Sequence, residues 1–319
     1  MKYKIAVIEE IHKDGLNLFN KHPDFEYELI TDVSESNLIK KLPNFDACTL
    51  RVSKLDGKIL KHCNKLKAIS RHGVGIDNVD LDYIKKNNVS LLVTATANAV
   101  AVAEHVISMF LSISKSISKY DEEVRKGNFK LNADKIQTFE LLNKNILIAG
   151  FGRIGKKLIS RCLAFNTKVY IYDPYVDEKI IKEFGGIKVD KIEDGLKNAD
   201  YVSLHMPLTN ETKNLVNYSV LKTMKKNSIL INTARGGIIN ELDLDKALNE
   251  GLIFGASLDV FSQEPIEKDN PLLKNKKVIL SPHSATFTNE CTSRMGIETT
   301  KNIIDFFENR IDKSMIVKL

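Results

Sequence analysis

The segment Ile146-Leu147-Ile148-Ala149-Gly150-Phe151-Gly152-Arg153-Ile154-Gly155 decides the fold of this chain. An apolar run followed at once by Gly-x-Gly-x-x-Gly is typical of a strand that turns sharply into a helix. The first glycine permits the tight turn, the second lets the backbone approach a pyrophosphate, and the third lets the helix pack close to the strand. The free N–H groups at the start of the helix then face the phosphates. The segment predicts a dinucleotide site at Gly150, Gly152 and Gly155.

A second strand with a carboxylate at its end supports this interpretation. Residues 168–172 read Lys-Val-Tyr-Ile-Tyr and lead to Asp173, 18 residues after Gly155. An acid about 20 residues beyond the glycines binds the adenosine ribose hydroxyls in such sites. Its charge repels a 2′-phosphate, so Asp173 favours NAD over NADP. The alternatives are a glycine turn with a purely steric role and an aspartate that only opens the turn at residues 173–175.

Length and cysteine content narrow the class of protein. The chain has 319 residues, of which 43% are hydrophobic, enough for two domains with packed cores. Its cysteines show neither paired spacing nor partnered histidines, which argues against disulfides and zinc; they are Cys48, Cys63, Cys162 and Cys291. We therefore expect a reducing, cytoplasmic location and no metal.

Charge and hydropathy exclude other partners. No apolar run approaches the roughly 18 residues of a membrane helix, and the chain opens on a strand rather than a signal peptide. The net charge is +6, but the 47 Lys and Arg residues are spread among 41 acids without aromatic clusters. We expect neither a membrane nor a nucleic-acid partner. The positive balance suits an anionic substrate, although a composition rich in lysine and asparagine is the simpler explanation.

The alternation of strands and helices predicts two α/β domains. In the first, strands are expected at residues 4–8, 27–30, 47–50, 68–70 and 91–93, with helices at 14–20, 34–42, 57–62 and 81–87. Short strands joined by helices form a parallel sheet covered on both faces. A second doubly wound sheet of six strands is expected from residues 146–149, 168–172, 201–205, 228–232, 254–259 and 278–281.

Two long helical segments connect these domains. Residues 98–126 are rich in alanine and aliphatic side chains and predict one helix from Asn98 to a stop at Gly127. So long and apolar a helix spans two domains, lies in an oligomer interface or is simply buried under the neighbouring sheet. The amphipathic segment 289–309 should return to the first domain. We thus expect a Rossmann-type cofactor domain, residues 99–286, inserted into a flavodoxin-like substrate-binding domain, residues 1–98 and 287–319, with the two closing over substrate.

Three strand ends of the second domain carry Arg235, Glu264 and His283. The carboxyl ends of parallel strands meet at one sheet edge, where such folds bind ligands. A protonated imidazole can give a proton to a carbonyl oxygen as hydride arrives, a carboxylate can raise the pKa of that imidazole, and a guanidinium can hold a substrate carboxylate. Together they predict hydride transfer coupled to proton transfer. Taken singly, they are equally explained as a surface ion pair, a turn cap and a structural histidine.

Sequence motifs extend this pattern over nearly the whole chain. GFGRIG (150–155), SLHMPLTNET (203–212), NTARGGIINE (232–241), ASLDVFSQEP (256–265) and SPHSAT (281–286) stand in the order and spacing of the D-isomer-specific 2-hydroxyacid dehydrogenases. LRVSKLDG (50–57), SRHGVGIDNVDL (70–81) and NAVAVAEHVI (98–107) also resemble that family. The resemblance implies a homodimer in which Arg235 anchors the substrate, His283 is the acid and base, and Glu264 is its partner.

The resemblance also implies the lining of both binding sites. It places NAD at Gly150, Gly152, Arg153, Ile154, Gly155, Asp173, His205, Met206, Pro207, Thr212, Thr233, Ala234, Asp259, Ser284 and Val74. It places the acid group of the substrate at Arg51, Ser53, Arg71, His72, Gly73, Val74 and Gly75. Asp259 is expected near the nicotinamide carboxamide. Ser284 is more polar than the residue usual beside the nicotinamide, which leaves the fine placement of that ring open.

The segments around Arg51 and Arg71 look most like D-3-phosphoglycerate dehydrogenases, which act at the start of serine biosynthesis. A phosphorylated substrate requires a cation besides Arg235, for which Arg51, Arg71 and His72 are candidates. Reduction of hydroxypyruvate, glyoxylate or another 2-oxo acid is the alternative. A corepressor-like protein that binds NAD without turnover is a third hypothesis, because a fold alone does not fix function.

Overall fold

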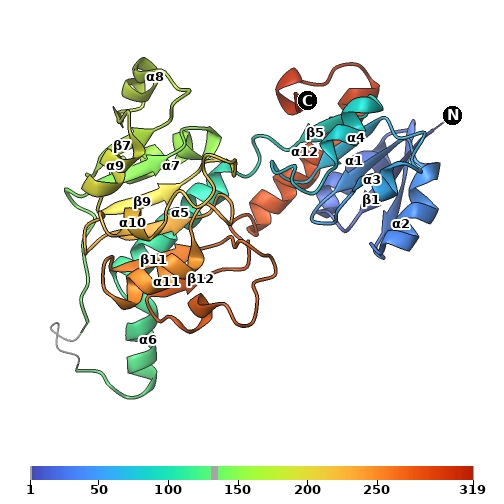
Figure 1. Ribbon diagram of the computed structural model, residues 1–319. Coiled ribbons are helices and arrows are strands. Elements are labelled where there is room, and N and C mark those ends of the chain that lie inside the picture. The colour runs from blue at the N-terminus through green and yellow to red at the C-terminus, as the bar shows by residue number, and fades with distance from the viewer. Residues whose placement is uncertain (1, 131–135, 319) are drawn as a thin grey trace. The chain divides into compact units, whose positions relative to one another are not determined.

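The computed structural model describes residues 2–130 and 136–318, and the chain divides into two compact units. Unit 1 comprises Met1–Asn98 and Phe287–Leu319, and unit 2 comprises Ala99–Thr286 (Figure 1). Each unit contains one sheet of parallel strands with helices on its faces. The predicted architecture of two parallel α/β sheets is confirmed.

In the described part of unit 1, five strands pair in the order β2-β1-β3-β4-β5. They are β1 (Tyr3–Ile8), β2 (Phe25–Ile30), β3 (Ala47–Leu50), β4 (Ala68–Arg71) and β5 (Ser90–Val93). The helices are α1 (Lys13–Lys21), α2 (Glu35–Lys41), η1 (Leu42–Asn44), α3 (Gly57–Leu60), α4 (Leu81–Lys86), α12 (Asn289–Phe307) and η4 (Lys313–Met315). This strand order is the flavodoxin-like one, which places ligands beyond the carboxyl ends of the strands.

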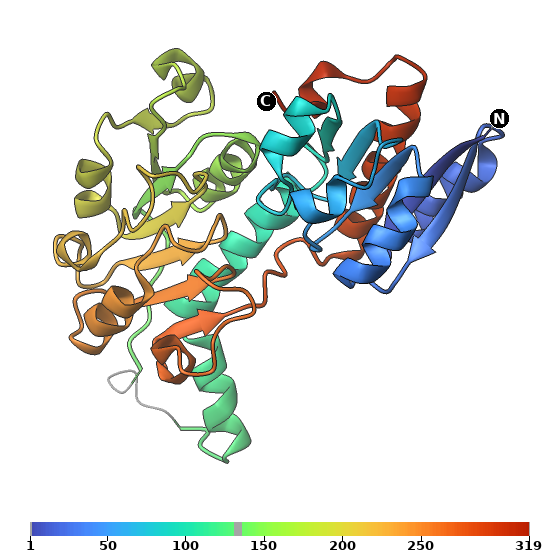
Figure 2. The ribbon, with the colours of Figure 1, turned by 45° about the vertical axis from the view of Figure 1, so that its right-hand side comes forward.

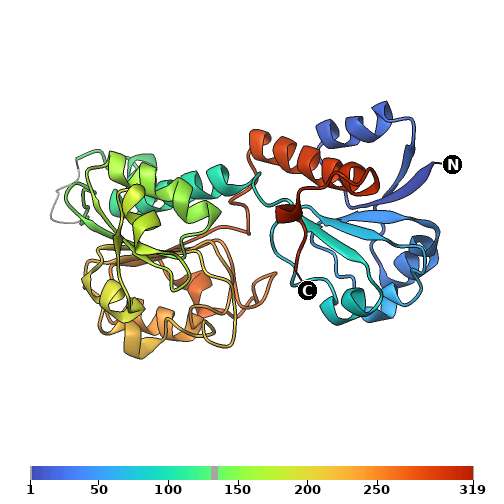
Figure 3. The same cartoon turned by 90° about the horizontal axis from the view of Figure 1, so that it is seen from above.

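The sheet of unit 1 separates two hydrophobic cores. Successive side chains of β1 point to opposite faces, so Ile5 and Val7 join one core whereas Ala6 and Ile8 join the other. The first core is closed by α1 and α12, which lie side by side (Figure 3). From α12 it receives Ile303 and Ile304. A segment from the end of the chain thus completes a core that the first residues begin.

Unit 2 contains one strand more than predicted. Its described strands pair in the order β12-β11-β10-β9-β6-β7-β8, all parallel. They are β6 (Asn145–Ala149), β7 (Lys168–Tyr172), β8 (Ile187–Lys188), β9 (Tyr201–Leu204), β10 (Ile229–Asn232), β11 (Gly255–Leu258) and β12 (Val278–Leu280). The prediction of six strands was wrong because β8 has only two residues, too few to show any alternation in sequence.

The helices of unit 2 include a correction as well. They are α5 (Ala99–Ser114), α6 (Ile117–Arg125), α7 (Arg153–Ala164), α8 (Glu178–Glu183), α9 (Ile192–Asn198), α10 (Tyr218–Leu221), α11 (Glu241–Asn249) and η3 (Pro271–Lys274). The single helix predicted over residues 98–126 is two helices bent by 56°. Ser116, between them, has φ 50°, a left-handed conformation that an α-helix cannot continue.

The apolar composition of α5 is explained by burial in its own unit. Val106, Met109 and Phe110 of α5 are buried in a core of unit 2. The helix packs against α7, β10 and β11 (Figure 2). By contrast, α6 buries none of its described side chains. Over the residues that the structure describes, no single helix is long and apolar enough to cross a membrane, and α5 and α6 satisfy that test only as a bent pair.

Candidate active site

The three glycines in the turn after β6 have different structural roles. Gly150 has φ 104°, and a Cβ there would lie 2.6 Å from the carbonyl oxygen of His205. A Cβ at Gly155 would lie 2.5 Å from the carbonyl oxygen of Gly150. At Gly152, in contrast, a Cβ would meet no described atom within 4 Å. The first and third glycines are required by the protein itself, whereas the second leaves open space at the start of α7, as a bound pyrophosphate requires.

This turn lies at the switch point of the sheet. From β6 the chain continues to β7 on one side and later returns to β9 on the other. Doubly wound sheets bind ligands in the crevice that such a reversal leaves beyond the strand ends. Gly150, after β6, and His205, after β9, bring their backbones into contact at this point.

Asp173 lies beside the glycine turn. It follows β7, and its Oδ2 accepts a hydrogen bond of 2.8 Å from the N–H of Phe151. Its Oδ1 accepts one of 2.9 Å from the N–H of Tyr175. The carboxylate therefore also stabilises the turn at residues 173–175, which is the alternative role considered for Asp173. A carboxylate has about four acceptor sites, so both oxygens keep lone pairs for ribose hydroxyls.

Of the other cofactor residues predicted in unit 2, Arg153 and Ile154 are the first two residues of α7. The rest lie in loops beyond neighbouring strands of the same sheet. His205, Met206, Pro207 and Thr212 follow β9, Thr233 and Ala234 follow β10, Asp259 follows β11, and Ser284 follows β12. Val74 belongs to unit 1.

Two buried polar atoms in these loops test whether a dinucleotide fits. Nδ1 of His205 and Oγ1 of Thr233 are buried without a hydrogen-bond partner among the described residues. Burial lowers the pKa of His205 to about 4, so its imidazole is neutral at neutral pH. Buried polar atoms are normally paired. Unpaired atoms in the loops after β9 and β10 fit a polar ligand such as NAD.

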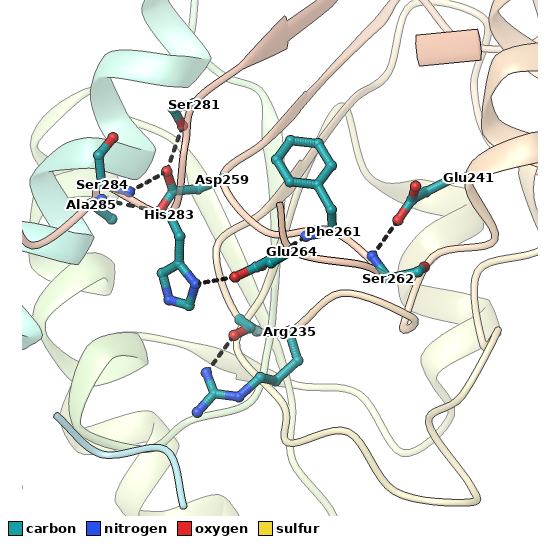
Figure 4. A network of polar contacts seen from close by, with 11 residues as sticks. Arg235, Glu241, Asp259, Phe261, Ser262, Glu264, Ser281, His283, Ser284 and Ala285 are labelled. Atoms are coloured by element: carbon teal, nitrogen blue, oxygen red, sulfur yellow. Dashed lines mark hydrogen bonds and ion pairs between the residues drawn. The ribbon is translucent and has the colours of Figure 1, made fainter. Parts of the chain in front are cut away.

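The central pair of the site is His283 and Glu264. His283 Nδ1 donates a hydrogen bond of 2.8 Å to Glu264 Oε2, because a carboxylate oxygen can only accept (Figure 4). That bond raises the pKa of His283, although partial burial opposes the change. Partial burial alone would raise the pKa of Glu264, but hydrogen bonds from His283 and from the N–H of Phe261 lower it overall. The pair therefore favours a protonated imidazole next to an ionised carboxylate.

Arg235 adds a positive charge to the same site. Its loop after β10 is held by Asn232, whose side chain donates to the Arg235 carbonyl at 2.8 Å and accepts from the N–H of Ala234 at 3.0 Å. A Cβ at Gly236 would lie 1.8 Å from the carbonyl oxygen of Phe261, so the Arg235 loop contacts the Glu264 loop directly. The charge of Arg235 lowers the pKa of both Glu264 and His283. Arg235, Glu264 and His283 are thus brought together, as their positions at strand ends suggest (Figure 4).

Asp259 is used within the protein. Its side chain is 1% exposed, and its oxygens accept hydrogen bonds from Ser281 Oγ at 2.6 Å, from the N–H of Ser284 at 2.8 Å and from the N–H of Ala285 at 3.0 Å (Figure 4). These donors stand on both sides of His283, whose φ is 52°. Asp259 therefore holds the loop that carries His283 in a left-handed conformation that is uncommon for residues other than glycine.

Sequence reasoning missed the residues that support this site from outside. Glu241, the first residue of α11, accepts a hydrogen bond of 2.6 Å from the N–H of Ser262 and so holds the Glu264 loop (Figure 4). Ser281 and Asn232 act in the same way on the other two loops. Only their places inside the recognised motifs at residues 232–241 and 281–286 could have indicated them.

The substrate-binding residues predicted in unit 1 lie beyond the ends of β3 and β4. Arg71 forms hydrogen bonds within the protein: its guanidinium donates to the carbonyls of Gly75, Leu50 and Arg51. Arg51 donates through Nη1 to the carbonyl of Glu10 at 2.8 Å. Burial, helped by the charge of Arg51, lowers the pKa of His72 to about 4. At neutral pH His72 therefore adds no positive charge.

The loop that follows Arg51 is held by an acid absent from the predicted set. Glu9, at the end of β1, has φ 65° and accepts hydrogen bonds from the N–H of Val52 at 2.9 Å and of Ser53 at 3.0 Å. The predicted residues Gly73, Val74 and Gly75 follow β4, where Gly73 has φ 149° and Val74 is 40% exposed. This edge of unit 1 thus combines arginines, an acid and exposed apolar side chains.

Known proteins are similar to this chain in both sequence and fold. Residues 107–285 match the family model of the D-isomer specific 2-hydroxyacid dehydrogenase, NAD binding domain. The chain is 31% identical, over 98% of its length, to a D-3-phosphoglycerate dehydrogenase of Methanocaldococcus jannaschii, but spans 59% of that protein. It is 34% identical, over 100% of its length, to a glyoxylate reductase of Thermococcus litoralis and spans 98% of that protein.

A solved structure extends the similarity to the whole fold. The D-lactate dehydrogenase of Aquifex aeolicus, complexed with NAD and lactic acid, superimposes with a TM-score of 0.86 at 28% identity, over 98% of both chains. The glycine turn, the acid after β7 and the histidine paired with a glutamate lie inside the region that the family model matches. The chain therefore belongs to the D-isomer specific 2-hydroxyacid dehydrogenase family, and its residues 107–285 correspond to the NAD-binding domain of that family.

Proposed function

We propose that this chain is an NAD-dependent dehydrogenase that interconverts a D-2-hydroxy acid and its 2-oxo acid. The observation that carries the proposal is the His283–Glu264 hydrogen bond of 2.8 Å, with Arg235 beside it, at the sheet edge that also carries the glycine turn. Family membership supports the same reaction class.

The chemistry follows from the charges of these side chains. NADH, when bound, supplies the hydride. Because Nδ1–H of His283 is engaged by Glu264, the second proton of the protonated ring sits on Nε2, and the raised pKa keeps it there to higher pH than in an ordinary histidine. The imidazolium gives this proton to the carbonyl oxygen of the 2-oxo acid, and the neutral ring takes it back in the reverse reaction. Arg235 binds the carboxylate of the substrate, since a guanidinium matches it with two parallel hydrogen bonds.

The cofactor is held by unit 2 in this proposal. The backbone at Gly150 and Gly152 and the start of α7 bind the pyrophosphate. Asp173 accepts the ribose hydroxyls, which favours NAD. His205 and Thr233 offer their unpaired buried atoms to the cofactor.

The residues of unit 1 bear on which 2-hydroxy acid is the substrate. Sequence resemblance favours 3-phosphoglycerate, and hence a role in serine biosynthesis, with Arg51, Ser53 and residues 71–75 at the acid group. The charges of unit 1 favour the second candidate, a short unphosphorylated 2-oxo acid such as glyoxylate or hydroxypyruvate. His72 is neutral, and Arg71 donates to three backbone carbonyls. Of the cations proposed for a phosphate, these two contribute less than the sequence suggests.

We propose further that the protein is a cytoplasmic homodimer with no nucleic-acid or membrane partner. The support for a dimer comes from α6. Its apolar residues Ile117 and Val124 are 55% and 52% exposed, and none of its described residues is buried. An amphipathic helix of this kind is stabilised by packing its apolar side on another surface. A second copy of the chain supplies that surface.

A turnover assay tests the proposed activity. NADH oxidation is measured with glyoxylate, hydroxypyruvate and pyruvate, and NAD reduction with 3-phosphoglycerate, alongside NADH binding by fluorescence. We expect turnover of at least one 2-oxo acid with NADH. NADH binding without turnover of any of these acids would favour the corepressor-like hypothesis instead.

A further inference from the structure

His105 lies in the second turn of α5 and contacts the loop that carries His283. Its Nε2 lies 3.3 Å from Ser281 Oγ and 3.8 Å from Asp259 Oδ1. Ser281 Oγ in turn lies 2.6 Å from Asp259 Oδ1. All three residues belong to unit 2.

The direction of these hydrogen bonds follows from donor counts. A carboxylate can only accept, so the single hydroxyl proton of Ser281 goes to Asp259. The oxygen of Ser281 must then accept from His105, which places a proton on Nε2 of His105. The bonds run in one direction, from His105 through Ser281 to Asp259. Each bond in such a chain polarises the next one.

The end of this chain is the carboxylate that fixes His283. Asp259 also accepts from the N–H groups of Ser284 and Ala285, so its donors flank His283 on both sides. His283 has φ 52°, a conformation that persists only where neighbouring contacts impose it. The anchor provided by α5 is rigid, because that helix is largely buried in the core of unit 2.

We propose that His105 is a positioning residue for His283, acting through Ser281 and Asp259. The reactive role that it serves rests on the proposed function, but the geometric role does not. Without the His105 donor, the oxygen of Ser281 loses its partner and the loop at residues 281–285 gains freedom. The bond from His283 to Glu264, which depends on that loop, then weakens.

The test uses the full chain and compares His105→Phe, which removes the donor, with His105→Gln, which retains an N–H donor. His62→Phe, at an exposed histidine of unit 1, is the matched control. NMR titration of the His283 ring, assigned by its loss in His283→Asn, reads the pKa of His283 without any turnover. The charged groups that act on this ring are Glu264, Asp259 and Arg235, and all three are kept in these variants.

We expect the pKa of His283 to fall towards its ordinary value in His105→Phe and to return towards that of the parent in His105→Gln. Steady-state rates should show kcat lower by about tenfold or more in His105→Phe, because small displacements of reacting groups cost up to ~100-fold, with KM for the 2-oxo acid changed far less. Ser281→Ala should have the same effect and replaces His105→Phe if that variant fails to fold.

The proposal is overturned if the pKa of His283 is the same in His105→Phe and the parent, or if His105→Gln is altered as much as His105→Phe. A change of similar size in His62→Phe also overturns it. A parent protein that turns over no 2-oxo acid refutes the proposed function alone, since the NMR titration still decides the role of His105.

Discussion

Glu264 sets the pH range over which His283 stays protonated. Reduction of a 2-oxo acid needs the imidazolium, so activity is present below the pKa of His283 and is lost as pH rises through it. Since the bond to Glu264 raises that pKa, the loss occurs at higher pH than for an ordinary histidine. In Glu264→Gln we expect the alkaline limb of kcat/KM for reduction to move to lower pH. A profile that coincides with that of the parent would show that Glu264 does not tune the histidine.

Removing His283 itself should separate chemistry from cofactor binding. In His283→Ala we expect turnover to fall by about 10² to 10⁴-fold, the usual contribution of general acid catalysis. NADH affinity should change little, because the phosphate-binding turn lies after a different strand. Steady-state rates and a fluorescence titration with NADH check both parts. Activity within about threefold of the parent would end the assignment of His283 as proton donor.

Asp173 is expected to determine the choice of cofactor. Asp173→Ala removes the acceptor for the ribose hydroxyls and the charge that repels a 2′-phosphate. NADH should bind more weakly, and the difference in Kd between NADH and NADPH should narrow. Fluorescence titrations with both cofactors measure this. A parent protein that already binds both equally would contradict the role given to Asp173.

At this scale, sequence reasoning identified the reactive side chains better than their supports. Arg235, Glu264 and His283 were predictable because the ends of parallel strands meet at one edge. The hydrogen bonds of Asp259 to the neighbouring loop at residues 281–285 were not, since they depend on the pairing of β11 with β12 and on the conformation of His283. Glu9 escaped notice because its φ of 65° has no signature in sequence.

Among the elements, the turn into α7 offers a comparison of two alanine substitutions. Gly155→Ala places a Cβ 2.5 Å from the Gly150 carbonyl oxygen and should lower the Tm. Gly152→Ala meets no described atom within 4 Å and should leave the Tm nearly unchanged while weakening NADH binding. Thermal unfolding and NADH titration of both variants test this. Equal NADH affinity in Gly152→Ala and the parent would remove the pyrophosphate from this turn.

The order of the elements was predictable from alternating apolar and polar segments, and two departures have local causes. Strand β8 has only two residues and is recognisable only by its pairing with β7. The break between α5 and α6 occurs at Ser116, within a segment whose side chains are otherwise compatible with a helix. In both places the backbone, rather than the pattern of side chains, determines the outcome.

For the whole molecule, the proposed dimer can be measured directly. Light scattering of the parent should give about twice the 36.0 kDa mass of the chain. Val124→Asp places a charge on the exposed apolar side of α6 and should shift the mass towards that of one chain. A parent mass near 36.0 kDa at all concentrations would exclude the dimer.

The return of α12 to unit 1 has a consequence for synthesis on the ribosome. The sheet of unit 1 emerges first, but Ile303 and Ile304, which complete one of its cores, are translated only after all of residues 99–286. At the usual rate of about 5–20 residues per second, this face of the nascent sheet waits roughly 10 to 40 s for its cover. During that interval Ile5, Val7 and Leu92 belong to an exposed apolar surface that chaperones or neighbouring nascent chains can bind.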